Sequence, residues 1–169
     1  MRFAPAAAAL SLALAVTASV GMAKDRDPSP RAAMLIAEGK AALAEGDTQG
    51  AIDAYEAALA VDPGYTPIFI ELGNAARADD LQGKAIRYYR EALVRDPGNL
   101  AAISGEGAAL VEKGALEKAR LNLAKLESLC GDDCPETQRL ATAIAAGPQE
   151  RVLTAEAVMP EASVSPQSN

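Results

Sequence analysis

The chain has 169 residues and a formal charge of −7 at pH 7, and half of its residues are hydrophobic although only 4% are aromatic. The sequence contains no His, which excludes Ser-His-Asp and Cys-His catalysis, HExxH zinc sites and histidine-ligated haem. The acidic balance argues against an electropositive nucleic-acid-binding surface, and an apolar fraction rich in Ala favours helices over a β-sandwich.

Residues 1–23 are organised like an export signal. Arg2 is followed by an uncharged apolar stretch over 6–20, and Ala23 is a small residue that suits a signal-peptidase site. The apolar run is shorter than the ~20 residues that a spanning helix needs. We therefore predict a cleaved signal peptide and a mature chain without a membrane span, located in the periplasm of a Gram-negative bacterium. A retained anchor is the alternative.

Residues 24–31 are polar and contain two prolines, which indicates a flexible linker. The sequence then repeats, because the motif AIxxYxxALxxDPG begins at Ala51 and begins again at Ala85, 34 residues later. A 34-residue period indicates a helical solenoid. Within each copy the apolar residues fall on one helix face, and Pro63 or Pro97 ends the helix because proline lacks a backbone N–H.

This pattern resembles the tetratricopeptide repeat (TPR). The matching residues are Leu35, Gly39, Ala51, Tyr55, Ala58 and Pro63 in repeat one, 32–65, and Phe69, Leu72, Gly73, Ala85, Tyr89, Ala92 and Pro97 in repeat two, 66–99. Repeat one departs from the family pattern at Glu38, where Leu is usual. The resemblance implies an all-α fold: a right-handed α-α superhelix of about three helix hairpins.

The C-terminal part follows the pattern less closely. Residues 100–133 form a divergent third repeat, which keeps Ile103 and Gly107 but has Leu123 where the Tyr stood. A capping helix is predicted over 134–147, since Pro135 suits the first helical position and Gly147 is followed by a proline. Residues 148–169 show no sustained period and are predicted to be a disordered tail.

Two cysteines lie where the third repeat ends and the capping helix begins. In an oxidising compartment, Cys130 and Cys134 are most simply a structural disulfide. A redox-active thiol pair stays open, although the spacing is C-x3-C and Asp132 and Asp133 would raise a thiol pKa. A metal site also stays open, although neither a His nor a third Cys completes a zinc set. We predict no metal and no cofactor.

In TPR proteins the first helix of each hairpin lines a concave groove. The resemblance therefore implies a partner-binding groove formed by Ile36, Lys40, Leu43, Ile70, Asn74, Arg77, Ser104, Ala108 and Val111. For Ile36, Leu43 and Ile70, packing between repeats is an equally weighted alternative. A full carboxylate clamp, as in the chaperone-binding members of the family, is not supported because Ser104 and Ala108 are not basic.

The predicted function is protein–protein interaction without catalysis. The chain would be an adaptor or assembly factor that binds a peptide or protein of the cell envelope, and it would not bind nucleic acid. The alternative is a thiol-redox or metal-handling periplasmic protein that uses Cys130 and Cys134. Three repeats are near the minimum for a stable array, so a homo-oligomer formed through repeat edges is a further option.

Overall fold

The structure, a computed structural model, describes residues 26–148, and all regular secondary structure within them is helical. The helices are α1 (Pro30–Ala44), α2 (Thr48–Val61), α3 (Pro67–Ala78), α4 (Gln82–Arg95), α5 (Leu100–Glu112), α6 (Leu116–Cys130) and α7 (Pro135–Ala146). The predicted all-α repeat fold is confirmed. The predicted signal peptide and all but the first residue of the predicted tail lie outside the described residues.

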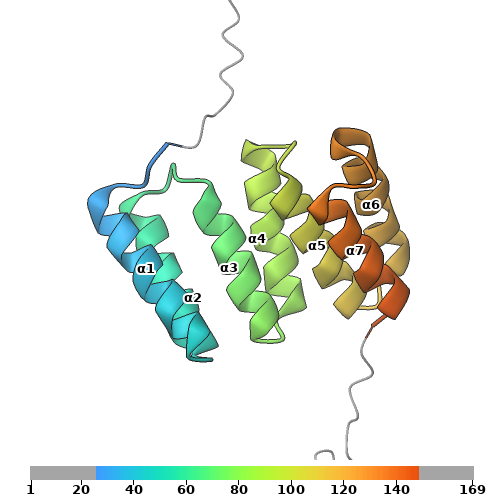
Figure 1. The fold of residues 1–169 in the computed structure, drawn as a ribbon. Helices are drawn as coiled ribbons and strands as arrows, with labels where there is room; N and C mark the ends of the chain where they lie inside the picture. The colour runs from blue at the N-terminus through green and yellow to red at the C-terminus, as the bar shows by residue number, and fades with distance from the viewer. Residues whose placement is uncertain (1–25, 149–169) are drawn as a thin grey trace, which may run out of the picture.

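The helices form hairpins that stack side by side (Figure 1). α1 pairs with α2, α3 with α4, and α5 with α6, while α2 contacts α3 and α4 contacts α5. The first helices of successive hairpins form one layer, in which α3 contacts α5 and α5 contacts α7. α7 also packs on α6, so it closes the C-terminal end of the array.

Polar side chains fix where several helices begin. Ser29 caps α1 by accepting the N–H of Ala32, so the helix starts at Pro30, two residues before the predicted repeat boundary. Asn99 caps α5 by accepting the N–H of Ala102 at 3.0 Å. These caps satisfy N–H groups that have no partner within the first helical turn.

The segment ahead of α1 is held by a buried carboxylate. Asp62, in the turn after α2, accepts the N–H of Ser29 at 2.9 Å and pairs with Arg26. Part of the segment predicted as a flexible linker is therefore fixed to the first hairpin. The hydrogen bond from Ser29, and then the one from Arg26, lower the pKa of Asp62. This contact stabilises the fold above the ordinary aspartate pKa and is lost as pH falls through the lowered value.

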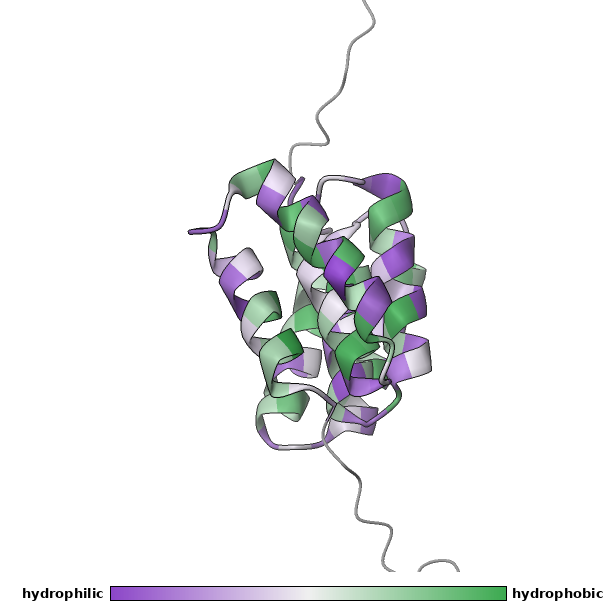
Figure 2. Ribbon diagram, turned by 90° about the vertical axis from the view of Figure 1, so that its right-hand side faces the viewer, coloured by the Kyte–Doolittle hydropathy of each residue, from purple (hydrophilic) through white to green (hydrophobic). Residues whose placement is uncertain are grey.

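The repeated tyrosine fills space that glycines leave between helices. Tyr89 on α4 is fully buried, and a Cβ added at Gly73 on α3 or Gly105 on α5 would lie 2.6 or 2.4 Å from its ring. Tyr55 on α2 faces Gly39 on α1 in the same way, at 2.5 Å. Hydrophobic and hydrophilic residues alternate around the helices (Figure 2), as expected when one face of each helix packs inward. The contact between each tyrosine ring and the glycine that faces it sets how closely the two helices approach.

The two buried tyrosines differ at their hydroxyl groups. Tyr89 Oη donates to Asn74 Oδ1 at 2.7 Å, whereas Tyr55 Oη is buried with no hydrogen-bond partner within 26–148. Burial raises the pKa of Tyr55 to about 12, with a smaller effect from Glu71. The deprotonated form of Tyr55 is therefore disfavoured at neutral pH.

Removing each hydroxyl is expected to have opposite effects on stability. Tyr55→Phe removes an unsatisfied buried group, so the free energy of unfolding should stay unchanged or rise by about 1 kcal/mol. Tyr89→Phe breaks a hydrogen bond and should lower it by about 1 kcal/mol. Urea denaturation of both variants measures the difference. A larger loss for Tyr55→Phe than for Tyr89→Phe would contradict the assignment.

Candidate functional site

The predicted groove residues divide into buried and accessible groups. Ile36 and Val111 are only 9% and 3% exposed and belong to the hydrophobic core. For Ile36 this is the packing alternative that the sequence left open, whereas the burial of Val111 differs from its predicted place in the groove, because its side of α5 turns toward neighbouring helices. Leu43 is half-buried and packs against the core of the first hairpin. Lys40 is exposed, and its Nζ lies 3.1 Å from an oxygen of Glu71 on α3.

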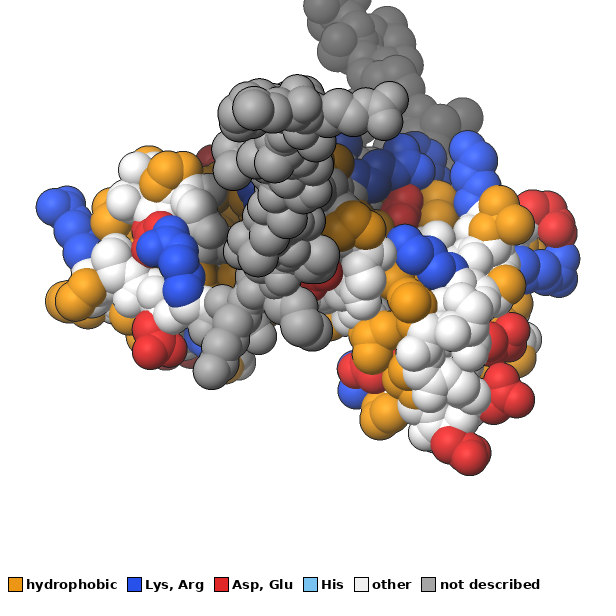
Figure 3. Space-filling model, turned by 90° about the horizontal axis from the view of Figure 1, so that it is seen from above, with side chains coloured by type: hydrophobic (Ala, Val, Ile, Leu, Met, Phe, Trp, Pro, Cys, Tyr) orange, Lys and Arg blue, Asp and Glu red, His pale blue; other side chains and the backbone are white. Residues whose placement is uncertain are grey.

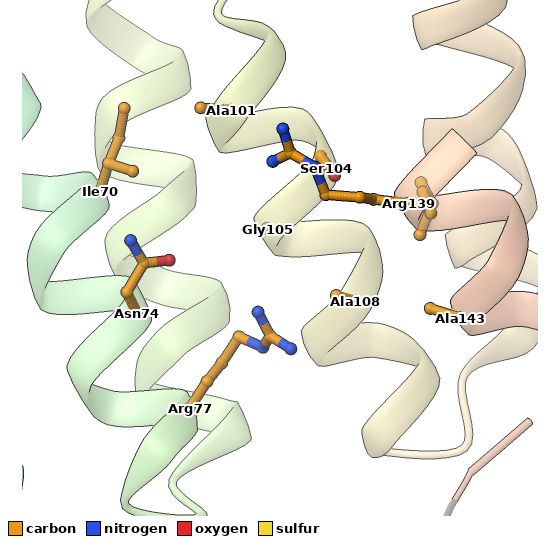
Figure 4. Close-up of a pocket in the computed structure, with 10 residues that line it drawn as sticks. Ile70, Asn74, Arg77, Ala101, Ser104, Gly105, Ala108, Arg139 and Ala143 are labelled. Atoms are coloured by element: carbon orange, nitrogen blue, oxygen red, sulfur yellow. The ribbon is translucent and has the colours of Figure 1, made fainter. Parts of the chain in front are cut away.

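The remaining five predicted residues come together around one cavity. This cavity, of about 300 Å³, lies between α3, α5 and α7. Its lining is Ile70, Asn74, Arg77, Ala101, Ser104, Gly105, Ala108, Arg139, Leu140 and Ala143 (Figure 4). Ser104 is itself only 8% exposed, and its hydroxyl donates to the Glu136 carbonyl at 3.2 Å. We call this site the α3–α5–α7 cavity.

Sequence reasoning missed the residues that α7 contributes. The sequence predicts a capping helix over 134–147 but places no groove residue on it. The available signal was the spacing of Arg139 and Ala143, which lie four residues apart and share one helix face. α7 contacts α5 as α5 contacts α3, so it occupies the place of a further first helix in the layer.

Two guanidinium groups reach this cavity from opposite sides. In Figure 4 the side chain of Arg77 extends from α3 toward α5, and that of Arg139 extends from α7 across Ser104. Arg77 Nε lies 3.1 Å from both carboxylate oxygens of Glu112, and hydrogen bonding to Glu112 raises the pKa of Arg77. Arg139 lies 3.4 Å from Glu136 on its own helix, and its side chain is 68% exposed.

Asn74 adds an amide between Ile70 and Arg77 (Figure 4). Its Oδ1 accepts the hydroxyl of Tyr89, so its Nδ2 hydrogens remain available to a ligand. Ala101 and Ala108 have small side chains and Gly105 has none, which leaves the surface of α5 open. The arrangement is suited to binding: two cations and an amide donor lie beside apolar surface.

The cysteine pair holds the base of α7. The sulfurs of Cys130 and Cys134 lie within disulfide-bonding distance, and their Cα atoms are 5.7 Å apart. Thr137 is buried at 3% exposure, and its hydroxyl donates to the carbonyl of Gly131 at 2.9 Å. Both links fix the start of α7, the helix that supplies Arg139, against the end of α6.

Replacing both cysteines with serine is expected to loosen α7 selectively. The loop between the cysteines is short, so the chain-entropy model gives a loss of about 2 kcal/mol. We expect faster amide hydrogen exchange in α7 and unchanged exchange in α1 and α2, measured by mass spectrometry. Alkylation of the freshly purified chain under denaturing conditions provides the control. Two alkylated thiols would contradict the disulfide.

Three further features concern metal binding, membrane crossing and surface charge. Between 26 and 148, no group of three or more His, Cys, Asp or Glu side chains is placed to hold a metal ion. In that range, none of the helices combines the length and apolar character needed to cross a membrane. Basic and acidic side chains are interspersed on the face drawn in Figure 3.

Neither a protein-family model nor a curated protein matches the chain. Solved structures do match it. The TPR domain of Sgt2 from Aspergillus fumigatus has a TM-score of 0.64 and 24% identity, over 84% of this chain and 93% of that chain. The first TPR domain of Spaghetti (RPAP3), bound to the HSP90 peptide SRMEEVD, has a TM-score of 0.62 and 22% identity, over 71% and 98% of the two chains.

A bacterial structure is similar as well. The Yersinia enterocolitica type III secretion chaperone SycD, in complex with a peptide of the translocator YopD, has a TM-score of 0.61 and 22% identity. The match covers 70% of this chain and 89% of that chain. These similarities show that the chain has the TPR fold.

Proposed function

We propose that this TPR domain is a non-catalytic adaptor or assembly factor that binds a peptide segment of a partner protein in the α3–α5–α7 cavity. The observation that carries the proposal is the convergence of five predicted groove residues on one cavity. Solved structures with this fold support it, since the Spaghetti (RPAP3) domain and SycD are each in complex with a peptide.

The proposed place of action is the cell envelope, most simply the periplasm. This rests on the sequence pattern of residues 1–23, which combines a basic start, an apolar stretch and small residues before a cleavage point. Fractionation of cells that produce the full chain tests it. The expected result is a chain released with the periplasmic fraction and shortened by the leader. A full-length chain in the cytoplasm would contradict this part of the proposal.

The binding face is tested by photo-crosslinking in the native host. A photoreactive residue at Ala101, which is exposed and lines the cavity, should join the chain to a partner protein. The same residue at Ala124, which is exposed on α6 and outside the cavity lining, is the matched control. The Ala101 product should weaken when Asn74 and Arg77 are both replaced by alanine. Equal products from Ala101 and Ala124, or an Ala101 product unaffected by the double substitution, would contradict the proposal.

A further inference from the structure

We infer that the second hairpin carries a separate binding site for a small aromatic anion, in a pocket formed by α3 and α4. The pocket has a volume of about 110 Å³ and is lined by Phe69, Lys84, Arg87, Tyr88 and Glu91. We call it the α4 pocket. None of these residues lines the α3–α5–α7 cavity, so the inference goes beyond the proposed function and does not depend on it.

Tyr88 forms one wall of the α4 pocket, and contacts with α2 hold it in place. Tyr88 Oη donates to Glu56 Oε1 at 2.7 Å, and Lys84 Nζ lies 3.3 Å from the same oxygen. Lys84 Nζ also lies 5.8 Å from the centre of the Tyr88 ring, within the range of a cation–π contact. The half-buried Tyr88 ring is therefore fixed before any ligand binds.

Phe69 closes the bottom of the pocket. Its side chain is only 6% exposed, and the guanidinium carbon of Arg95 lies 4.2 Å from the centre of its ring. Arg95 is itself held by Glu91, at 3.0 Å. Phe69 therefore limits the depth of the pocket and offers a ligand little surface. The main contacts left to a ligand are the Tyr88 ring and the aliphatic part of Arg87.

The size of the pocket suits a single ring. An apolar cavity of about 150 Å³ takes up benzene. The α4 pocket is smaller but open to solvent, since Arg87 and Glu91 at its edge are exposed. It can receive one six-membered ring whose substituent stays outside. The Tyr88 wall favours an aromatic ring, because offset or edge-to-face ring pairs add energy beyond the buried area.

Arg87 supplies a charge that nothing in the described residues complements. Lys84 and Glu91 are paired with Glu56 and Arg95. In contrast, the guanidinium group of Arg87 forms neither an ion pair nor a hydrogen bond within residues 26–148. A guanidinium binds anions through charge-assisted hydrogen bonds and stacks on aromatic rings. The ligand class is therefore a flat ring that bears an anionic group.

The protonation of Tyr88 is compatible with a bound anion. Burial raises the pKa of Tyr88, and its hydrogen bond with Glu56 raises this pKa further, so the phenol is neutral at pH 7. Glu56 is not part of the pocket lining, and Lys84 offsets its charge. A ligand anion beside Arg87 therefore meets no additional negative charge from the Tyr88 wall.

The experiment is a titration of the purified, isotope-labelled chain with small probes, followed by amide chemical shifts in NMR spectra. Benzenesulfonate carries both the ring and the charge. Benzenesulfonamide keeps the ring and nearly the same shape but is neutral, and methanesulfonate keeps the anion without a ring. We expect benzenesulfonate to bind at least about fivefold more tightly than either comparison probe. The shifts should centre on residues 84–91 and leave α7 unchanged.

Variants separate the two contacts. Arg87→Gln should weaken binding of benzenesulfonate about fivefold and leave binding of benzenesulfonamide unchanged. Tyr88→Leu should weaken binding of both, because it removes the ring contact. Arg31→Gln is the matched control, since Arg31 on α1 is exposed and its guanidinium group also has no ion pair within the described residues. Circular dichroism confirms that each variant is folded.

Several results would overturn the α4 pocket as a site for an aromatic anion. Equal affinity for benzenesulfonate and benzenesulfonamide would leave only an apolar pocket, and equal affinity for methanesulfonate only an anion contact. Full affinity in Arg87→Gln, or no shift at millimolar benzenesulfonate, would also contradict it. Shifts centred on α5 and α7 would place the anion in the α3–α5–α7 cavity instead. The crosslink from Ala101 tests the proposed function independently of all these outcomes.

Discussion

Replacing Tyr89 with alanine is expected to lower the free energy of unfolding by about 4 kcal/mol. The ring is fully buried, and truncating a buried aromatic side chain typically costs 3–5 kcal/mol. The ring also lies between Gly73 and Gly105, which have no side chains to fill the space that it would leave. Three helices, α3, α4 and α5, would therefore lose their common contact.

The thermal midpoint should fall by roughly 15 °C, measured by circular dichroism at 222 nm. Leu121→Ala is the control, because Leu121 on α6 is 71% exposed, and it should change the free energy of unfolding by less than about 0.5 kcal/mol. A loss below about 1 kcal/mol for Tyr89→Ala would show that the helices bearing Gly73 and Gly105 can move together and fill the space left by the ring. The packing described for α3, α4 and α5 would then be wrong.

Leu140→Ala is expected to detach α7, with a local cost of about 3 kcal/mol. Leu140 is 1% exposed, and a Cβ added at Gly107 on α5 would lie 2.5 Å from its side chain. This contact is the main apolar anchor of α7 on α5. Its loss should leave α1 to α4 folded, because α7 packs mainly on α5 and α6.

Hydrogen exchange should rise across α7 and stay unchanged in α2 in the Leu140→Ala variant. Crosslinking from the photoreactive residue at Ala101 should weaken as well, since α7, which lines part of the cavity, would be displaced. Gln138→Ala, at an exposed position on the same helix, is the control. Uniform loss of protection over all helices would show that α7 unfolds together with the array.

The sequence predicted the fold well because its period is long and specific. A Tyr and a Gly at fixed offsets indicate that two helices pack closely. The prolines after Asp62 and Asp96 mark where the second helices of the hairpins end. The third hairpin has no such Tyr. Its position followed from the retained Ile103 and Gly107, which the structure places in the core.

The candidate site was predicted only in part. The positions of Asn74 and Arg77 followed from the repeat pattern, but their partners Tyr89 and Glu112 lie 15 and 35 residues away along the chain. α3 and α5 each pack against their own hairpin partner and also against each other. An apolar residue such as Val111 therefore cannot be assigned to the groove or to the core from spacing alone.

Arg139 could not be predicted for a different reason. The terminal helix of a repeat array needs one polar, solvent-exposed face, and Arg139 fits that role as well as it fits a binding site. Its place at the cavity depends on how closely α7 sits on α5, which the contact between Leu140 and Gly107 sets. That contact joins residues far apart in sequence and leaves no periodic signal.

α7 both closes the C-terminal end of the helix array and lines the α3–α5–α7 cavity. These two roles limit how the protein can change in length. In most modular arrays, a unit can be added or removed at an end because the end serves only to cover the last interface. Here a hairpin inserted after α6 would move Arg139 away from Arg77 and divide the cavity. Growth by duplication is therefore open at the N-terminal side, whereas the C-terminal side is fixed by the site that it completes.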